Sequence, residues 1–232
     1  RGRPSASGHN RVVSIWLEPE PQNWYPLVDD ALAEDIGMGD VTAGALPPDA
    51  LVKWAIEAQA DGVLCGVGIA EYVLGPFGND PEECYVDVHK ADGEWIHRGD
   101  VVISGLAPAR KVMSHERTAL NFVMHLSGVA TLTASFVQRV DGTGAKIVDT
   151  RKTLPLLRVL QKYAADIVLL DNMDPFTMRE AVKRHKGKVL FEASGGISLE
   201  TVRAVAQTGV ELISVGALTH SAPSMAFHLE LE

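Results

Sequence analysis

The sequence predicts an α/β protein in two parts, a mixed α+β unit followed by a parallel sheet built from βα units. Short β-type segments broken by Gly and Asp occupy the first part, up to Asp141, and favour an antiparallel sheet there. After Gly144, short apolar segments alternate with helical ones, which is typical of a parallel sheet covered on both faces. With 232 residues, 46% of them hydrophobic, the chain can bury a core without metals or disulfides.

The first part begins with a helix, expected over residues 24–36, where apolar residues recur at helical spacing until Gly37 and Gly39. A long helix, or two joined near Gly128, is expected over 116–139. The β-type segments between these helices are residues 52–60, 62–66, 84–89 and 101–105.

The second part contains four apolar strand segments, at residues 145–149, 166–170, 189–192 and 211–215. A polar or glycine-bearing cluster follows each of them, and ligands of parallel α/β folds bind at these strand ends. A small closed barrel needs about eight strands. Moreover, a helical segment ends near Tyr163 with no turn before the strand at Asp166, although such connections take about two to six residues. We therefore expect that sequence is missing between these two residues.

Composition limits the functions that the chain can have. The net charge of −9 disfavours a sequence-independent nucleic-acid binder, so we expect neither a nucleic-acid nor a membrane partner. Two cysteines cannot form a disulfide scaffold or a structural zinc site, and they suit a reducing cytoplasm. The expected domains are a tail at 1–23, an α+β domain at 24–142 and a barrel domain at 143–232, whose C-terminal segment returns to the first domain.

A basic pair and a single arginine stand out against this acidic background. Thr150, Arg151 and Lys152 follow the first parallel strand, where adjacent Arg and Lys suit a carboxylate or phosphate; the alternative is a solvated basic turn. Arg117 would lie at the third position of a helix capped by Ser114. Because a cation is unfavourable at a helix N-terminus, Arg117 is expected to serve a ligand outside its helix, or else to pair on the surface.

The later strand ends carry one carboxylate and two glycine turns. Asp171 suits a ligand hydroxyl or Mg²⁺, which is held by one or two carboxylates plus substrate phosphate; its alternative role as a helix cap fits Asp174 better. Glu192 either binds a hydroxyl or is structural. Backbone N–H groups at the glycine turns can bind a phosphate. The residues of these turns are Ser194, Gly195 and Gly196 after one strand, and Val215, Gly216 and Ala217 after the next.

Taken together, these motifs resemble the quinolinate phosphoribosyltransferases. The matching segments, in the family's order, are ALAEDIGMGDVTA (31–43), HERTALNFVMHLSGVATLTA (115–134), AKIVDTRKTLPLLRVLQKYA (145–164), ADIVLLDNM (165–173), FEASGGISLETV (191–202) and VELISVGALTHSAP (210–223). The resemblance implies an N-terminal sandwich-like α+β domain, an incomplete TIM-like parallel barrel, and a homodimer or larger assembly whose active site is shared between subunits.

The resemblance also implies an activity and roles for the residues. Ribose 5-phosphate would pass from phosphoribosyl pyrophosphate to quinolinate with loss of CO₂, giving nicotinate mononucleotide, with Mg²⁺ as cofactor. The family has further sequence after residue 164, including a second Arg, a Lys and a Glu of its site. Two alternatives stay open: a pyrophosphorylase for another heterocyclic acid, and a non-catalytic paralogue or isoform. Lys152 and Asp171 would be catalytic, Arg117, Arg151 and Lys152 would anchor the carboxylates, and the two glycine turns would hold the 5-phosphate.

Overall fold

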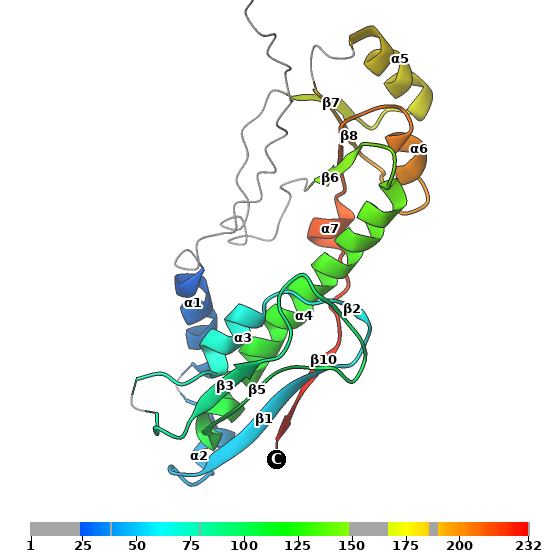
Figure 1. The fold of residues 1–232 in the computed structure, drawn as a ribbon. Coiled ribbons are helices and arrows are strands. Elements are labelled where there is room, and N and C mark those ends of the chain that lie inside the picture. Colours follow the sequence, from blue (N-terminus) through cyan, green and yellow to red (C-terminus); the bar gives the residue numbers. More distant parts are fainter. Residues whose placement is uncertain (1–23, 38, 79, 149–166, 186–189, 232) are drawn as a thin grey trace, which may run out of the picture.

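The computed structural model describes residues 24–37, 39–78, 80–148, 167–185 and 190–231, which form two units connected by one long helix, α4 (Figure 1). The first unit lies around the N-terminal half of α4 and the second around its C-terminal end. Each unit has its own apolar core, one centred on Trp54, Ile56 and Ile103, the other on Phe136 and Phe191. The two-part α/β architecture expected from the sequence is confirmed.

The first unit is an antiparallel sheet packed against helices. Its strands lie in the order β10-β1-β5-β3, and a smaller sheet pairs β2 with β4. The helix α3 follows Gly66, whose φ of +98° a residue with a side chain rarely adopts, and this helix was not expected from the sequence. The elements are α1 (Tyr25–Ile36), α2 (Val41–Gly44), β1 (Leu51–Ala58), β2 (Gly62–Val63), α3 (Val67–Leu74), β3 (Tyr85–Val88), β4 (Trp95–Ile96) and β5 (Val101–Pro108).

The helix α4 runs over Ala109–Val140, so it is a single helix that begins seven residues earlier than expected. The Ser114 hydroxyl donates to the carbonyl of Arg110 and does not cap the helix. Arg117 therefore lies in the third turn, and the prediction that it opposes the helix dipole was wrong. The early start follows from Pro108, whose fixed φ of −58° suits the residue before a helix.

Polar contacts hold the middle of α4 against the first unit. Ser127, fully buried, accepts a hydrogen bond from the Cys65 N–H and donates to the Cys65 carbonyl, while Thr131 accepts from the N–H of Val63. By length and composition alone α4 could cross a membrane. It nevertheless contacts α1, α3 and β2 of the first unit and α6, α7 and β6 of the second. Its apolar side chains therefore pack in the cores of both units.

The second unit is a parallel sheet of four strands among the residues described, in the order β6-β9-β8-β7. Helices cover one face of this sheet, where Leu170, Phe191 and Ile213 are buried. On the opposite face Leu169 and Leu190 are 52% and 47% exposed, so the cover expected on that second face is not found among the residues that the structure describes. The elements are β6 (Lys146–Val148), β7 (Ile167–Asp171), α5 (Pro175–His185), β8 (Leu190–Ser194), α6 (Val202–Ala206), β9 (Leu212–Ser214) and α7 (Ala217–His220).

The C-terminal segment returns from the second unit to the first. Its strand β10 (Phe227–Leu231) pairs antiparallel with β1 and completes the first sheet (Figure 1). On the way it crosses α4 at Gly128, where a Cβ atom would lie only 2.0 Å from the Pro223 carbonyl oxygen. Only glycine allows this close crossing, which fixes the second unit relative to the first sheet.

Candidate functional site

A cavity of about 300 Å³ opens at the C-terminal ends of β7, β8 and β9. The pairing of Asp171 with Ser194 places the last residues of β7 and β8 side by side. Six of the residues singled out from the sequence line this cavity, namely Asp171, Ser194, Gly195, Gly196, Gly216 and Ala217, together with Ile197 and His220. The cavity thus brings together residues that are up to 46 positions apart in the chain, as their places at parallel strand ends predict.

Residues with positive φ angles follow both β7 and β8. Gly195 has a φ of +91°, and a Cβ at this position would lie 2.9 Å from the backbone nitrogen of Asn172. Asn172 itself has a φ of +54°, and its N–H donates to the Ser194 carbonyl at 2.7 Å. The ends of β7 and β8 are therefore held in close backbone contact, which requires glycine at position 195.

Free backbone donors surround the cavity. Within the part of the chain that the structure describes, the N–H groups of Gly195, Gly196, Ile197 and Gly216 donate no hydrogen bond. Successive unpaired N–H groups in glycine turns form an anion-binding concavity. Asp171 is exposed at the same cavity, and its carboxylate makes no ion pair with any described residue. The site therefore offers donors for a phosphate beside one free carboxylate.

Asp174 has the capping role expected for it, which leaves Asp171 available to a ligand. The Asp174 carboxylate accepts hydrogen bonds from the Thr177 hydroxyl at 2.6 Å and from the N–H groups of Thr177 and Phe176. These bonds, that from the Thr177 hydroxyl foremost, hold the pKa of Asp174 below its usual range. The start of α5 is thereby fixed directly after the cavity.

His220 belongs to the cavity and was not predicted. It ends the one-turn helix α7, and its Nε2 atom would lie 2.8 Å from a Cβ at Gly216. Its Nδ1 atom is hydrogen-bonded to the Ser221 hydroxyl at 2.6 Å. The signal in the sequence was the spacing of four residues between Gly216 and His220, which places both on one side of a helical turn.

The remaining predicted residues lie elsewhere. Val215 is fully buried, and its N–H donates to the carbonyl of Val148, so it ties β9 to β6 beneath the cavity. Glu192 is partly buried on β8, paired with Leu169 and Leu212. Thr150, Arg151 and Lys152 lie outside the residues that the structure describes, as does the expected break at 163–166.

Arg117 lines a different cavity, in the first unit. This cavity of about 300 Å³ lies between α4 and the loop after α1, and Asp35, Asp40 and Glu116 also border it. The Arg117 side chain is exposed and makes no ion pair with a described residue. Along α4 it is about 22 Å from Leu132, which packs against the second core. Arg117 is not among the residues that line the strand-end cavity of its own chain.

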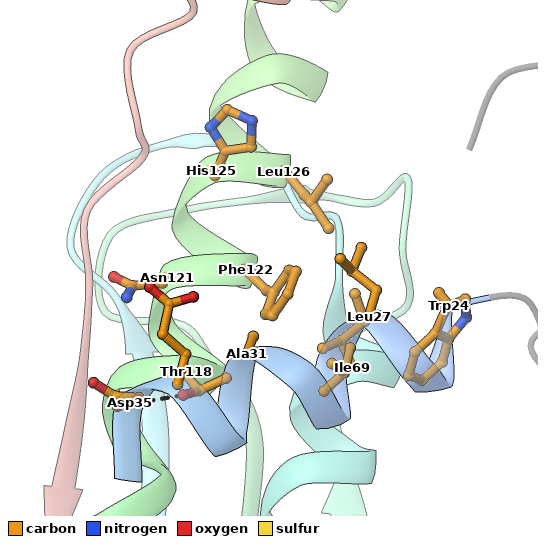
Figure 2. A pocket seen from close by; sticks show the side chains of 12 residues that line it. Trp24, Leu27, Ala31, Asp35, Ile69, Thr118, Asn121, Phe122, His125 and Leu126 are labelled. Atoms are coloured by element: carbon orange, nitrogen blue, oxygen red, sulfur yellow. Dashed lines mark hydrogen bonds between the residues drawn. The ribbon is translucent and has the colours of Figure 1, made fainter. Parts of the chain in front are cut away.

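The largest cavity of those described, about 440 Å³, lies between α1 and α4 (Figure 2). Phe122 and Leu126 of α4 face Leu27 of α1 across it, and Asp35, hydrogen-bonded to Thr118, lies at its other end. No lysine or arginine lines it. A mostly apolar cavity with acidic groups at one end does not suit an anionic ligand.

Comparison with known proteins identifies the family. The N-terminal domain of quinolinate phosphoribosyl transferase matches residues 40–127, and the C-terminal domain matches residues 129–166 and 164–230. The chain belongs to the quinolinate phosphoribosyltransferase family. A nicotinate-nucleotide pyrophosphorylase (carboxylating) from Mycobacterium leprae is 33% identical, over 87% of this chain and 94% of the relative. The probable enzyme of that name from Bacillus subtilis is 29% identical, over 88% and 92%.

The fold agrees with this assignment. The crystal structure of a nicotinate-nucleotide pyrophosphorylase from Ehrlichia chaffeensis superposes with a TM-score of 0.82 at 29% identity, covering 89% of this chain and 98% of the other. The family thus accounts for both units of the chain.

The relatives also carry sequence that this chain lacks. The alignments to the two bacterial relatives run over 269 and 270 positions, more than the 232 residues of the chain. The match to the C-terminal domain divides at residues 164–166, where the sequence predicts missing material. This position lies between β6 and β7, the two outer strands of the parallel sheet. Relative to its family, the quinolinate phosphoribosyltransferase fold is therefore interrupted between the two sheet edges.

Proposed function

We propose that the chain transfers the ribose 5-phosphate unit of phosphoribosyl pyrophosphate to the ring nitrogen of quinolinate and releases pyrophosphate and CO₂. Family membership supports this reaction, because the relatives are named carboxylating nicotinate-nucleotide pyrophosphorylases. The observation that carries the proposal is the strand-end cavity, where the N–H groups of Gly195, Gly196 and Gly216, which have no partner among the described residues, lie with Asp171. The N–H groups suit the 5-phosphate, and the carboxylate suits the sugar side.

The proposed reaction needs no dedicated general base. The quinolinate nitrogen forms a bond to C1 of the ribose while the bond from C1 to pyrophosphate breaks, and positive charge develops on the sugar ring. Asp171, beside the sugar, would stabilise that charge. When the 2-carboxylate then departs as CO₂, the electron pair of the broken bond stays on ring carbon 2, where the adjacent positively charged nitrogen stabilises it until a proton from solvent is taken up there.

Mg²⁺ is part of this proposal. A free carboxylate at a phosphate site fits the ion, which protein sites bind through one or two carboxylates plus substrate phosphates. Asp171 would hold it, directly or through a water molecule. Bound Mg²⁺ would stabilise the negative charge that develops on the pyrophosphate.

Arg151 and Lys152 are the proposed anchors of the two quinolinate carboxylates, with Thr150 beside them, and Arg117 is proposed to come from a second subunit. The position of Arg117 at a separate cavity, in the first unit, supports a contribution in trans. The compartment proposed is the cytoplasm, which suits the two free cysteines. Relatives from Arabidopsis thaliana and Nicotiana tabacum are named chloroplastic and mitochondrial, so the compartment varies within the family.

Formation of nicotinate mononucleotide from quinolinate and phosphoribosyl pyrophosphate tests the reaction. Asp171→Asn should lower kcat at least about tenfold, since charge stabilisation in the transition state is lost. Asp141→Asn is the matched control, an exposed carboxylate in the turn after α4. No turnover by the unsubstituted chain would favour a non-catalytic paralogue, whereas turnover of another heterocyclic acid alone would favour the related pyrophosphorylase.

Subunit complementation tests the shared site. Arg117→Ala and Arg151→Ala chains, each inactive, are mixed and allowed to exchange. A mixed dimer then has one site with both defects and one with neither, so random exchange should restore about a quarter of the unsubstituted activity. No recovery, with exchange verified by mass, would assign Arg117 to its own subunit. Arg151→Ala should also weaken quinolinate binding by about 2–5 kcal/mol, and a change below about threefold in affinity would remove Arg151 from the site.

A further inference from the structure

Three side chains that can bind a metal lie together on the antiparallel sheet of the first unit, where β10 pairs with β1. Glu57 of β1 is directly opposite His228 of β10, and Glu230 is two residues further along β10. Since successive residues of a strand point to opposite faces, these three side chains share one face of the sheet. The buried side chains of Ile56 and Phe227 point to the other face, into the core with the helices. The three ligands therefore lie on the face turned away from the helices.

The ligand atoms of the three side chains are close enough to share one ion. One ring nitrogen of His228 and one carboxylate oxygen each of Glu57 and Glu230 all lie within 4.8 Å of one another. Within this set, the Nε2 atom of His228 and a carboxylate oxygen of Glu230 are 2.8 Å apart. Zinc binds nitrogen and oxygen at about 2.0–2.2 Å, which places ligand atoms about 3.4 Å apart in a tetrahedron. Rotation of the glutamate side chains would therefore close the set around an ion without movement of the strands.

The negative charges of this group are not balanced by lysine or arginine. Neither Glu57 nor Glu230 makes an ion pair with such a side chain among the residues that the structure describes. Glu57 accepts a hydrogen bond from the Gln59 amide at 3.0 Å, and Glu230 is hydrogen-bonded to the ring of His228. Like charges on neighbouring positions of paired strands are destabilising. A divalent cation would replace this repulsion by attraction, and the Gln59 amide would orient Glu57 as the partners of metal ligands do.

We propose that Glu57, His228 and Glu230 bind a zinc ion, with water as the fourth ligand, and that this ion holds the C-terminal strand β10 on the first sheet. Zinc takes imidazole and carboxylate ligands, and open sites combine three protein ligands with one water. The imidazole favours Zn²⁺ over Mg²⁺, which prefers oxygen ligands. Among the described residues β10 is an outer strand that pairs with β1 alone, so the ion would add a second connection between these strands.

Calorimetric titration of the full chain with zinc chloride, in the presence of excess Mg²⁺, tests this site. His228→Gln and Glu57→Gln should each lower the zinc affinity at least about tenfold, since removal of even an outer partner of a metal ligand costs that much. His97→Gln is the matched control and should leave the affinity unchanged. His97 is also an exposed histidine beside a carboxylate, with its Nδ1 atom 3.6 Å from Asp61, but it has no second carboxylate in reach among the described residues.

Amide hydrogen exchange provides an independent measurement on the unsubstituted chain. Zinc should slow exchange in β10 and leave β3, the outer strand at the other side of the same sheet, unchanged. The proposal is overturned by an absence of zinc binding, by equal losses of affinity in His97→Gln, or by exchange in β10 that zinc does not alter. An affinity that both His228→Gln and Glu57→Gln leave intact would show an adventitious ion only and would overturn it as well. If the substituted chains fail to fold by circular dichroism, the exchange result decides. None of these outcomes depends on catalytic turnover.

Discussion

Replacing Gly195 by alanine should destabilise the turn after β8 for two separate reasons. Its φ of +91° lies outside the left-handed region near +60° that residues with a side chain occasionally adopt. An added Cβ would also meet the Asn172 backbone nitrogen at 2.9 Å and its Cα at 3.0 Å. Because both atoms belong to backbone held by the hydrogen bond from Asn172 to Ser194, they cannot move away freely.

The neighbouring glycine separates these two effects. Gly196 has a φ of +62°, within the left-handed region, and an added Cβ would meet no atom within 4 Å. Gly196→Ala should therefore cost about 1 kcal/mol of stability through conformational strain alone. Gly195→Ala should cost about 2–4 kcal/mol, as strain and overpacking add.

Urea unfolding of both variants, followed by circular dichroism, measures the difference. Affinity for phosphoribosyl pyrophosphate, measured by calorimetry on the folded variants, should fall more for Gly195→Ala, because its donor N–H is displaced with the turn. Equal losses of stability in the two variants would refute the close-approach argument. A Gly195→Ala chain as stable as the unsubstituted one would refute the turn geometry itself.

Three further predictions concern the packing and charges of the described residues. Gly128→Ala should destabilise the chain by about 3 kcal/mol or prevent folding, because its Cβ would overlap the Pro223 carbonyl. Gly68 is helical and an added Cβ there would meet no atom within 4 Å, so Gly68→Ala should stabilise the chain by up to about 1 kcal/mol. Thermal unfolding measures both effects. Lys111→Met should lower the free energy of unfolding by about 1–3 kcal/mol, because Asp80 would lose the partner 2.8 Å away that keeps its pKa low despite partial burial. Lys53→Met, at an exposed lysine, is the control. An unchanged pKa of Asp80 in an NMR titration would contradict this prediction. The stabilisation of α5 by Asp174 should be present above the ordinary pKa of aspartate and lost as the pH falls through the lowered folded-state pKa, so Asp174→Ala should lower the melting temperature at pH 7 but not at pH 2.

Local patterns in the sequence were sufficient for the strands of the parallel sheet and for the site residues at the ends of β7, β8 and β9, but not for α3 or the start of α4. Apolar runs alternating with helices located all four strands of the parallel sheet, and the residues after three of them meet at one cavity, because parallel strands end at the same edge. The family motifs carried the remaining assignment. These features depend on neighbours in the chain, which the sequence displays directly.

The tertiary structure decided what depends on contacts between distant residues. The early start of α4 rests on Pro108 and on Arg110, whose side chain donates to the carbonyl of Leu46, 64 residues away. His220 enters the cavity only because α7 folds back over Gly216. The pairing of β6 with β9, which makes β6 and β7 the outer strands of the parallel sheet among the described residues, involves strands 66 residues apart. No local pattern shows such pairings, because the free energy of a strand edge depends on which strand lies beside it.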